Sequence, residues 1–200
     1  TTGVKVFNWV TTMYKGALTF ETPMLFSIAF VILFTFGGFT GMMLSIAAAD
    51  TQYHDTYFVV AHFHYVMVAG AVFSGTAAVY YWLPKWCGRM YDETMGKVQF
   101  WIAFIAFNIT FMPQHFLGLA GMPRRYSDYG LQFADWNMVS SIGAFMYGGA
   151  QLLFLFNVIR TIGWGKPIDD PKVWEGAEGL EWTLPTPAPF HTFSTPPVLK

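Results

Sequence analysis

The sequence has 200 residues, of which 54% are hydrophobic, 20% are aromatic and only 12% are charged. Soluble domains usually carry about 25% charged residues, so this composition argues against a soluble domain. The net charge of −1 offers no basic face for nucleic acid, and the single cysteine, Cys87, excludes an intrachain disulfide and a thiolate metal cluster.

Four segments without Asp, Glu, Lys or Arg follow one another along the chain: 22–49, 56–84, 98–123 and 136–159. Each exceeds the roughly 20 residues that span a bilayer as a helix. We therefore predict an all-α, polytopic integral membrane helix bundle. Its expected parts are the end of a transmembrane helix at 1–15, transmembrane helices at 23–46, 56–84, 97–121 and 136–163, and an extended C-terminal tail at 164–200.

The charges in the connections predict the orientation of the bundle. Strict alternation places 47–55 and 121–135 on one side, where Arg124 and Arg125 are the only cations. The other side receives Lys15, Lys85, Arg89, Lys97, Arg160 and Lys166. Positive residues favour the cytoplasmic face, so the second side is expected to be inside, together with a cytoplasmic tail that serves as a partner-binding surface.

Three features come before the second long segment. By composition alone, Lys5 is a helix-end lysine whose side chain reaches the membrane interface, and Asp50 is a loop acid. The patch Gly37, Gly38 and Gly41 allows close approach of a neighbouring helix.

His54 and Asp55 stand at the start of the second segment. A neutral imidazole beside a carboxylate can bind a divalent ion whose shell is completed by oxygen donors and water. The alternative is an exposed helix start, where Asp55 is favoured by the helix dipole alone.

His62 and His64 follow within the same apolar segment, where a histidine is costly without a partner. At about 100° per residue they are roughly 200° apart on a helix and about 3 Å apart along its axis. They cannot chelate one metal, but they suit two flat cofactors on either side of the helix, each taking one imidazole as axial ligand. The alternative is a core histidine bonded to a neighbouring carbonyl.

Arg124 and Arg125 follow the end of the third segment. Adjacent guanidinium groups at the edge of an apolar bundle favour anions, and arginine pairs with carboxylates through two hydrogen bonds. An ordinary loop dipeptide is the alternative.

The segment HDTYFVVAHFHYV closely resembles the signature of the catalytic subunit of the haem–copper respiratory oxidases, subunit I of cytochrome c oxidase. The blocks TTGVKVFNW, FGGFTGMML, FMPQHFLGLAGMPRRYSDY and LPTPAPFHTF resemble successive parts of that subunit, in order, and the last favours a bacterial, aa3-like form. The likeness covers about the last five of the family's twelve helices. The start at Thr1, without Met or a basic signal-peptide region, fits a segment cut from inside a larger protein.

The resemblance implies two haems of type A. His62 is then the ligand of the high-spin haem and His64 one ligand of the low-spin haem. Arg124 and Arg125 match positions that contact the haem propionates, and Asp50 matches a position near the propionate of the high-spin haem. The family's copper ligands lie upstream, so copper belongs to the full-length subunit and has no ligand in this chain.

The resemblance also implies magnesium at His54 and Asp55, at the interface with subunit II, and a proton-uptake channel at Lys5 with Thr2. The implied reaction is reduction of O2 to water with electrons from cytochrome c, coupled to proton pumping across the bacterial inner membrane. Expected partners are oxidase subunits II and III, cytochrome c and the lipid bilayer.

Two other functions compete with this one. A quinol oxidase of the same superfamily is disfavoured by Asp55 and by the tail. A haem-binding membrane protein or transporter without enzymatic activity accounts poorly for His62 and His64 together with the arginine pair. The 200 residues alone are expected to be inactive.

Overall fold

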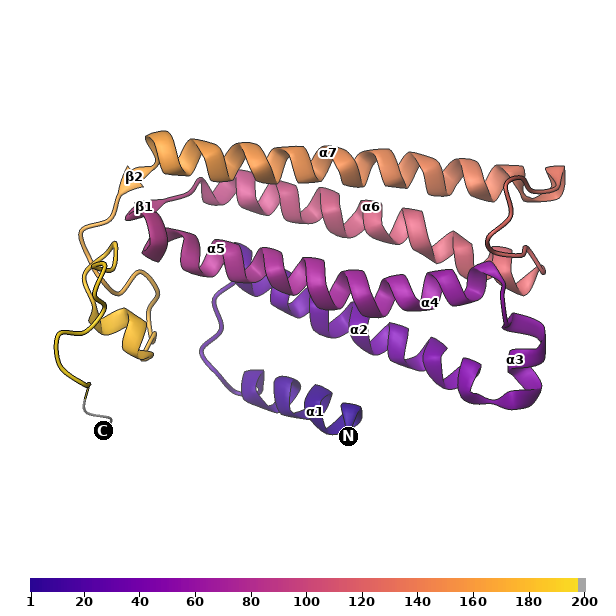
Figure 1. Cartoon of the computed structure of the whole chain (residues 1–200), viewed down its shortest axis with the longest axis horizontal. Helices are drawn as coiled ribbons and strands as arrows, with labels where there is room; N and C mark the ends of the chain where they lie inside the picture. Colours follow the sequence, from indigo (N-terminus) through magenta and orange to yellow (C-terminus); the bar gives the residue numbers. More distant parts are fainter. Residues whose placement is uncertain (198–200) are drawn as a thin grey trace.

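The computed structural model describes residues 1–197, in which long helices lie side by side (Figure 1). The helices are α1 (Thr2–Met13), α2 (Thr22–Ser45), α3 (Ala47–Tyr53), α4 (Tyr57–Val68), α5 (Ser74–Cys87), α6 (Glu93–Leu119) and α7 (Ala134–Trp164). A π-helical turn, η1 (Ala69–Phe73), joins α4 to α5, and η2 (Leu131–Phe133) and η3 (Leu180–Thr183) are 3-10 turns. The short strands β1 (Arg89–Met90) and β2 (Lys166–Pro167) pair antiparallel.

Four helical stretches are long and apolar enough to cross a membrane: Thr22–Ser45, Tyr57–Cys87, Glu93–Leu119 and Leu131–Trp164. The predicted all-α, polytopic membrane bundle is therefore confirmed. α6 begins at Glu93 rather than at residue 97, because the Asp92 carboxylate caps it by accepting a hydrogen bond from the Met95 amide (3.0 Å). α5 continues to Cys87 and ends at Gly88, whose φ of +70° suits glycine.

Two features of the connections were not predicted. α3 fills the connection after α2, where the run Ala47–Ala49 consists of strong helix formers. The N-cap of α4 is Thr56, whose hydroxyl accepts a hydrogen bond from the Phe58 amide (3.2 Å). Asp55 therefore lies immediately before the helix, in a left-handed conformation with φ +53°.

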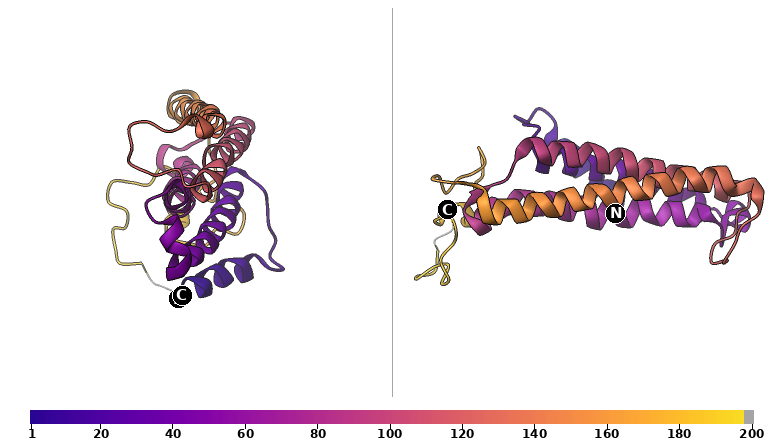
Figure 2. Two further views of the ribbon diagram at one scale, coloured as in Figure 1. Left: turned by 90° about the vertical axis from the view of Figure 1, so that its right-hand side faces the viewer. Right: turned by 90° about the horizontal axis from the view of Figure 1, so that it is seen from above.

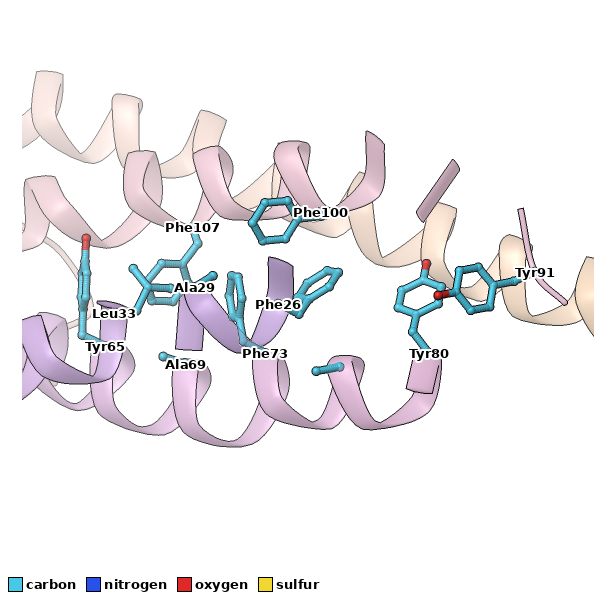
Figure 3. Close-up of a cluster of buried hydrophobic side chains, with 11 residues drawn as sticks. Phe26, Ala29, Leu33, Tyr65, Ala69, Phe73, Tyr80, Tyr91, Phe100 and Phe107 are labelled. Carbon is cyan, nitrogen blue, oxygen red and sulfur yellow. The ribbon is translucent and has the colours of Figure 1, made fainter. Parts of the chain in front are cut away.

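The core lies between α2, the α4–α5 helix and α6, and it consists largely of aromatic rings (Figure 3). The ring of Phe26 packs edge-on to Phe100 with 5.0 Å between centroids and tilted against Phe73 at 5.6 Å. α7 and α1 lie at opposite edges of the bundle (Figure 2). α1 buries no residue within the structure, and Trp9 packs it against Phe30 of α2 at 4.9 Å.

Glycines set the distances between the helices. A Cβ atom on Gly118 of α6 would overlap the backbone of Phe58 at the start of α4, and one on Gly143 of α7 would come within 2.6 Å of the Thr110 amide nitrogen of α6. Both neighbours are backbone atoms, which cannot move aside as a flexible side chain can. The helix backbones therefore approach one another more closely than any larger residue would allow.

The tail packs onto the end of α5. The Lys85 ammonium is buried and donates hydrogen bonds to the Leu184 carbonyl (2.6 Å) and the Thr186 hydroxyl (3.0 Å). The Trp174 indole donates to the Tyr81 carbonyl (2.8 Å) and stacks on the Tyr81 ring. The tail is irregular, as expected, but between residues 171 and 186 it is held against the bundle.

Replacing Gly118 by alanine should destabilise the protein by about 1–3 kcal/mol, because the added methyl group is forced against the Phe58 backbone. Thermal unfolding in detergent measures the effect. Gly148→Ala is the matched control, since a Cβ atom there meets nothing within 4 Å. Equal melting temperatures for the two variants would contradict the packing of α6 on α4.

Candidate functional site

The two histidines of α4 face different helices. The Nδ1 atom of His62 lies 2.9 Å from the Gly37 carbonyl and 3.1 Å from the Thr40 hydroxyl, both on α2. The Nδ1 atom of His64 lies 2.7 Å from the Val60 carbonyl of its own helix. The His64 ring stacks on Phe111 of α6, with 4.2 Å between centroids and 15° between planes.

These contacts determine where the protons of both rings must lie. A backbone carbonyl can only accept a hydrogen bond, so the nitrogen beside it has to carry hydrogen. For His62 and His64 alike this assigns the proton to Nδ1. The Nε2 lone pair of each ring is then available as a metal ligand.

The backbone of α2 lies close to His62. A Cβ atom on Gly41 would come within 2.7 Å of His62 Cε1, and one on Gly37 would come within 2.9 Å of the Val66 side chain. Nothing lies within 4 Å of such an atom on Gly38. Of the glycine patch, Gly37 and Gly41 therefore face α4, and Gly38 does not.

A second cluster lies at the end of the bundle that carries α3 and the loop after α6 (Figure 1). Asp55 is at its centre. Its carboxylate accepts a hydrogen bond from Arg124 Nε (2.8 Å), and it lies 3.4 Å from His54 Nε2 and 4.0 Å from Arg125 Nη1. The His54 ring is also 4.0 Å from Asp50. The fold thus brings these predicted residues together.

The backbone reinforces this cluster. The Arg124 amide donates to the Asp55 carbonyl (2.9 Å), and the Tyr57 amide donates to the Met122 carbonyl (3.0 Å). Arg125 has φ +67°, in the region that residues other than glycine rarely adopt. Its side chain is 74% exposed, whereas that of Arg124 is 20% exposed. Arg124 is held by its hydrogen bond to Asp55, whereas the exposed guanidinium of Arg125 can bind another anion.

The cluster lacks a complete metal site. Within residues 1–197, no group of three or more His, Cys, Asp or Glu side chains is placed to hold an ion. His54 and Asp55 can offer two ligands at most, so an ion here would need water or another chain for the rest. The Arg124 hydrogen bond holds the pKa of the Asp55 carboxyl below its usual value, with smaller contributions from the charges of His54 and Arg125.

The remaining predicted residues, Lys5 and Thr2, lie apart from both clusters. They are exposed on α1. Nothing in the described residues connects them with the histidines of α4 or with Asp55. The face of α1 that carries them is left uncovered by the rest of this chain.

Sequence reasoning missed the contribution of α2 to the histidine site. The glycine patch signalled a close contact, but nothing in the sequence indicated that Thr40 reaches His62. His115 is not among the site residues that the sequence predicted. It is 5% exposed, packs against the rings of Phe36, Phe58 and Tyr65, and has no hydrogen-bond partner for either ring nitrogen among the described residues.

Comparison with known proteins gave consistent matches. A family model described as "Cytochrome C and Quinol oxidase polypeptide I" matches residues 1–146. A protein of Cereibacter sphaeroides named cytochrome c oxidase subunit 1 is 51% identical over 197 residues, 98% of this chain and 35% of that protein. One of the same name from Bacillus sp. (strain PS3) is 48% identical over 202 residues, 100% of this chain and 32% of that protein.

This chain therefore spans about a third of the length of these relatives. Among solved structures, a chain from a study of a heme-copper terminal oxidase dimer superposes with a TM-score of 0.65. The match covers 72% of this chain and 27% of that one, at 18% identity. At that identity the likeness supports the fold alone.

The Asp55–Arg124 hydrogen bond predicts a pH dependence. A carboxyl whose pKa is lowered in the folded state stabilises the fold above its ordinary pKa, and this contribution is lost as the pH falls through the lowered value. Near neutral pH the cluster should stay intact. Arg124→Gln should raise the pKa of Asp55 toward its ordinary value of 3.8, as measured by infrared titration of the carboxyl.

Arg125→Gln is the control, because its guanidinium lies 4.0 Å from the Asp55 oxygen and forms no hydrogen bond with it. It should raise the pKa of Asp55 less than Arg124→Gln does. A larger rise with the Arg125 variant would contradict the assignment of Arg124 as the main partner.

Proposed function

The chain belongs to the family of cytochrome c and quinol oxidase polypeptide I, and from this membership we propose that it is part of the catalytic subunit of a cytochrome c oxidase. The whole subunit would reduce O2 to water with electrons from cytochrome c and couple this to proton pumping. The observation that best supports the proposal is the placement of His62 and His64, each with Nδ1 bonded to oxygen acceptors and Nε2 available.

The two histidines of α4 are suitable ligands for two haems. His62 would hold the high-spin haem and His64 the low-spin haem, each through Nε2, and the contacts of the two rings with α2 and α6 keep them on separate sides of the helix. When bound, the haems supply the redox chemistry of electron transfer and O2 reduction. The part played by this chain is to hold each imidazole in one orientation and one tautomer.

The outer cluster fits the anionic edge of a haem. Arg125 is exposed and can pair with a propionate through two hydrogen bonds. Arg124 would act from a fixed position, because Asp55 already holds its Nε atom. Asp50, next to His54 in the same cluster, would lie near the propionate of the high-spin haem.

We assign magnesium to His54 and Asp55. Their side chains are 3.4 Å apart, so one ion can contact both, and water or subunit II would complete its shell. The ion has to compete with Arg124 for the Asp55 carboxylate, which already accepts the Arg124 hydrogen bond.

Lys5, with Thr2, would belong to a proton-uptake channel. In support, α1 buries none of its residues against this chain, so other parts of the subunit can enclose it.

The membrane, partner subunits and haem type of the protein are proposed from the same family membership. The protein is an integral membrane protein with four helices that can span a bilayer. We place it in a bacterial inner membrane, with subunits II and III as partners and haem A as the haem type. The end of the bundle carrying Lys85, Arg89, Lys97, Arg160 and Lys166 would be cytoplasmic, and so would the tail. Copper would bind to upstream residues of the full-length subunit.

The family model covers quinol oxidases as well. Asp55 and the tail favour cytochrome c as the electron donor, and turnover of the intact enzyme with reduced cytochrome c and with a quinol decides between the two. The 200 residues alone should neither retain both haems nor reduce O2.

Changing the two histidines separately in the intact oxidase tests the proposed ligands. His62→Asn should abolish CO binding while largely sparing the low-spin spectrum, and His64→Asn should damage the low-spin haem first. Absorption spectra of the reduced protein with and without CO measure both. His115→Gln is the control, because this buried histidine is assigned no ligand role and should leave both signals. Equal loss of both signals in both variants would indicate structural collapse rather than ligation.

Substituting Mn²⁺ for Mg²⁺ tests the metal site in the intact enzyme. Asp55→Asn should remove the electron paramagnetic resonance signal of bound Mn²⁺, because a carboxylate ligand is lost. Asp128→Asn, a change at another exposed acid of the same outer side, should leave the signal. An undiminished signal in the Asp55 variant would exclude Asp55 as a ligand.

A further inference from the structure

We propose that Thr40 is a positioning residue for His62, fixing the tautomer and the plane of its imidazole; this rests on the proposed role of His62 as a haem ligand. Thr40 lies on α2 and is 6% exposed. Its hydroxyl oxygen is 2.9 Å from the Gly37 carbonyl oxygen and 3.1 Å from His62 Nδ1. The carbonyl oxygen is itself 2.9 Å from Nδ1, so the three polar atoms form a closed triangle.

The direction of each hydrogen bond in this triangle follows from what the atoms can do. The Gly37 carbonyl can only accept, so Nδ1 carries a proton, and the Thr40 hydroxyl donates its own hydrogen to the same carbonyl. The hydroxyl oxygen then presents lone pairs to Nδ1. The proton of His62 is therefore shared between two acceptors, and the other tautomer would set a lone pair of Nδ1 against the carbonyl.

Steric contacts complete the arrangement. Gly37, Thr40 and Gly41 are spaced so that they share one face of α2. A Cβ atom on Gly41 would come within 2.7 Å of His62 Cε1, so the ring edge lies against bare backbone. Rotation of the ring away from this face would break both of its hydrogen bonds with α2.

Thr40 differs in this respect from the other threonine in the middle of α2. The Thr35 hydroxyl donates to the Val31 carbonyl of its own helix (2.7 Å), which is the usual way for a threonine to satisfy its hydroxyl in a membrane helix. The Thr40 hydroxyl makes a comparable bond within α2 and in addition reaches across to α4. Of these two threonines, Thr40 is therefore the one that contacts the histidine.

Acceptors on the far nitrogen of a metal-bound imidazole raise the basicity of the nitrogen that binds the metal. With Thr40→Val the hydroxyl is lost at nearly constant shape, and Nδ1 keeps one acceptor instead of two. In the reduced, intact oxidase the iron–histidine stretching band of the high-spin haem, measured by resonance Raman spectroscopy, should therefore move to lower frequency and broaden. Thr40→Ser should restore the band, and Thr35→Val should leave it unchanged.

Thr40→Ala gives a second variant without the hydroxyl and without a branched side chain, and it should show the same shift. An unchanged band in both the Val and Ala variants, or an equal shift with Thr35→Val, would overturn the proposal. His62→Asn separates this failure from that of the proposed function. If the band survives in that variant, His62 is not the ligand; if it disappears while the Thr40 variants match the wild type, only the role of Thr40 is wrong.

Discussion

The arrangement of this protein depends on how closely α2 and α6 approach α4, because that distance decides which groups the histidines can reach. On one side the bare backbone at Gly37 and Gly41 lets the His62 ring lie against α2. On the other side Gly118 lets the backbone of α6 meet the start of α4 at Phe58. Larger residues at these positions would push the helices apart, and with larger residues at Gly37 or Gly41 the hydrogen bonds that His62 donates to α2 would be lost.

Most hydroxyl groups inside this apolar bundle are hydrogen-bonded, since an unpaired polar group is costly in hydrocarbon. Most hydroxyls bond to the carbonyl one turn earlier on their own helix, as Thr35 does. A few hydroxyls bond to a neighbouring helix instead. Ser140 of α7 donates to the Thr110 carbonyl of α6 (2.6 Å), and Tyr65 of α4 donates to Asn108 of α6 (2.7 Å). Such bonds fix the register of neighbouring helices, which the packing of smooth apolar faces alone does not determine.

Much of the fold could be predicted from the sequence, because uncharged segments longer than a bilayer leave few structures other than membrane helices. The opposed faces of His62 and His64 followed from helical periodicity. The rest depended on contacts between distant segments. The Thr40 hydroxyl reaches His62 only because two glycines bring α2 close to it, and the sequence did not indicate that the tail covers the Lys85 ammonium. The π-helical turn η1 could not be predicted, because the residues Ala69–Phe73 show no pattern that distinguishes them from an ordinary α-helix.

The helix that carries both histidines is fixed at its two ends by contacts of different kinds. At the start of α4 Asp55 holds Arg124, and the backbone bridge between Thr56 and Pro123 ties this end to the loop after α6. At the opposite end, on α5, which continues α4 through η1, the Lys85 ammonium is surrounded by carbonyl and hydroxyl oxygens of the tail, with the Trp182 ring 5.6 Å away. Neither end can slide along the bundle axis without breaking buried or paired polar contacts. A helix fixed in this way keeps its two imidazoles at a constant position along the bundle axis and in a constant direction. One helix can hold two separate cofactors through axial ligands only if both conditions are met.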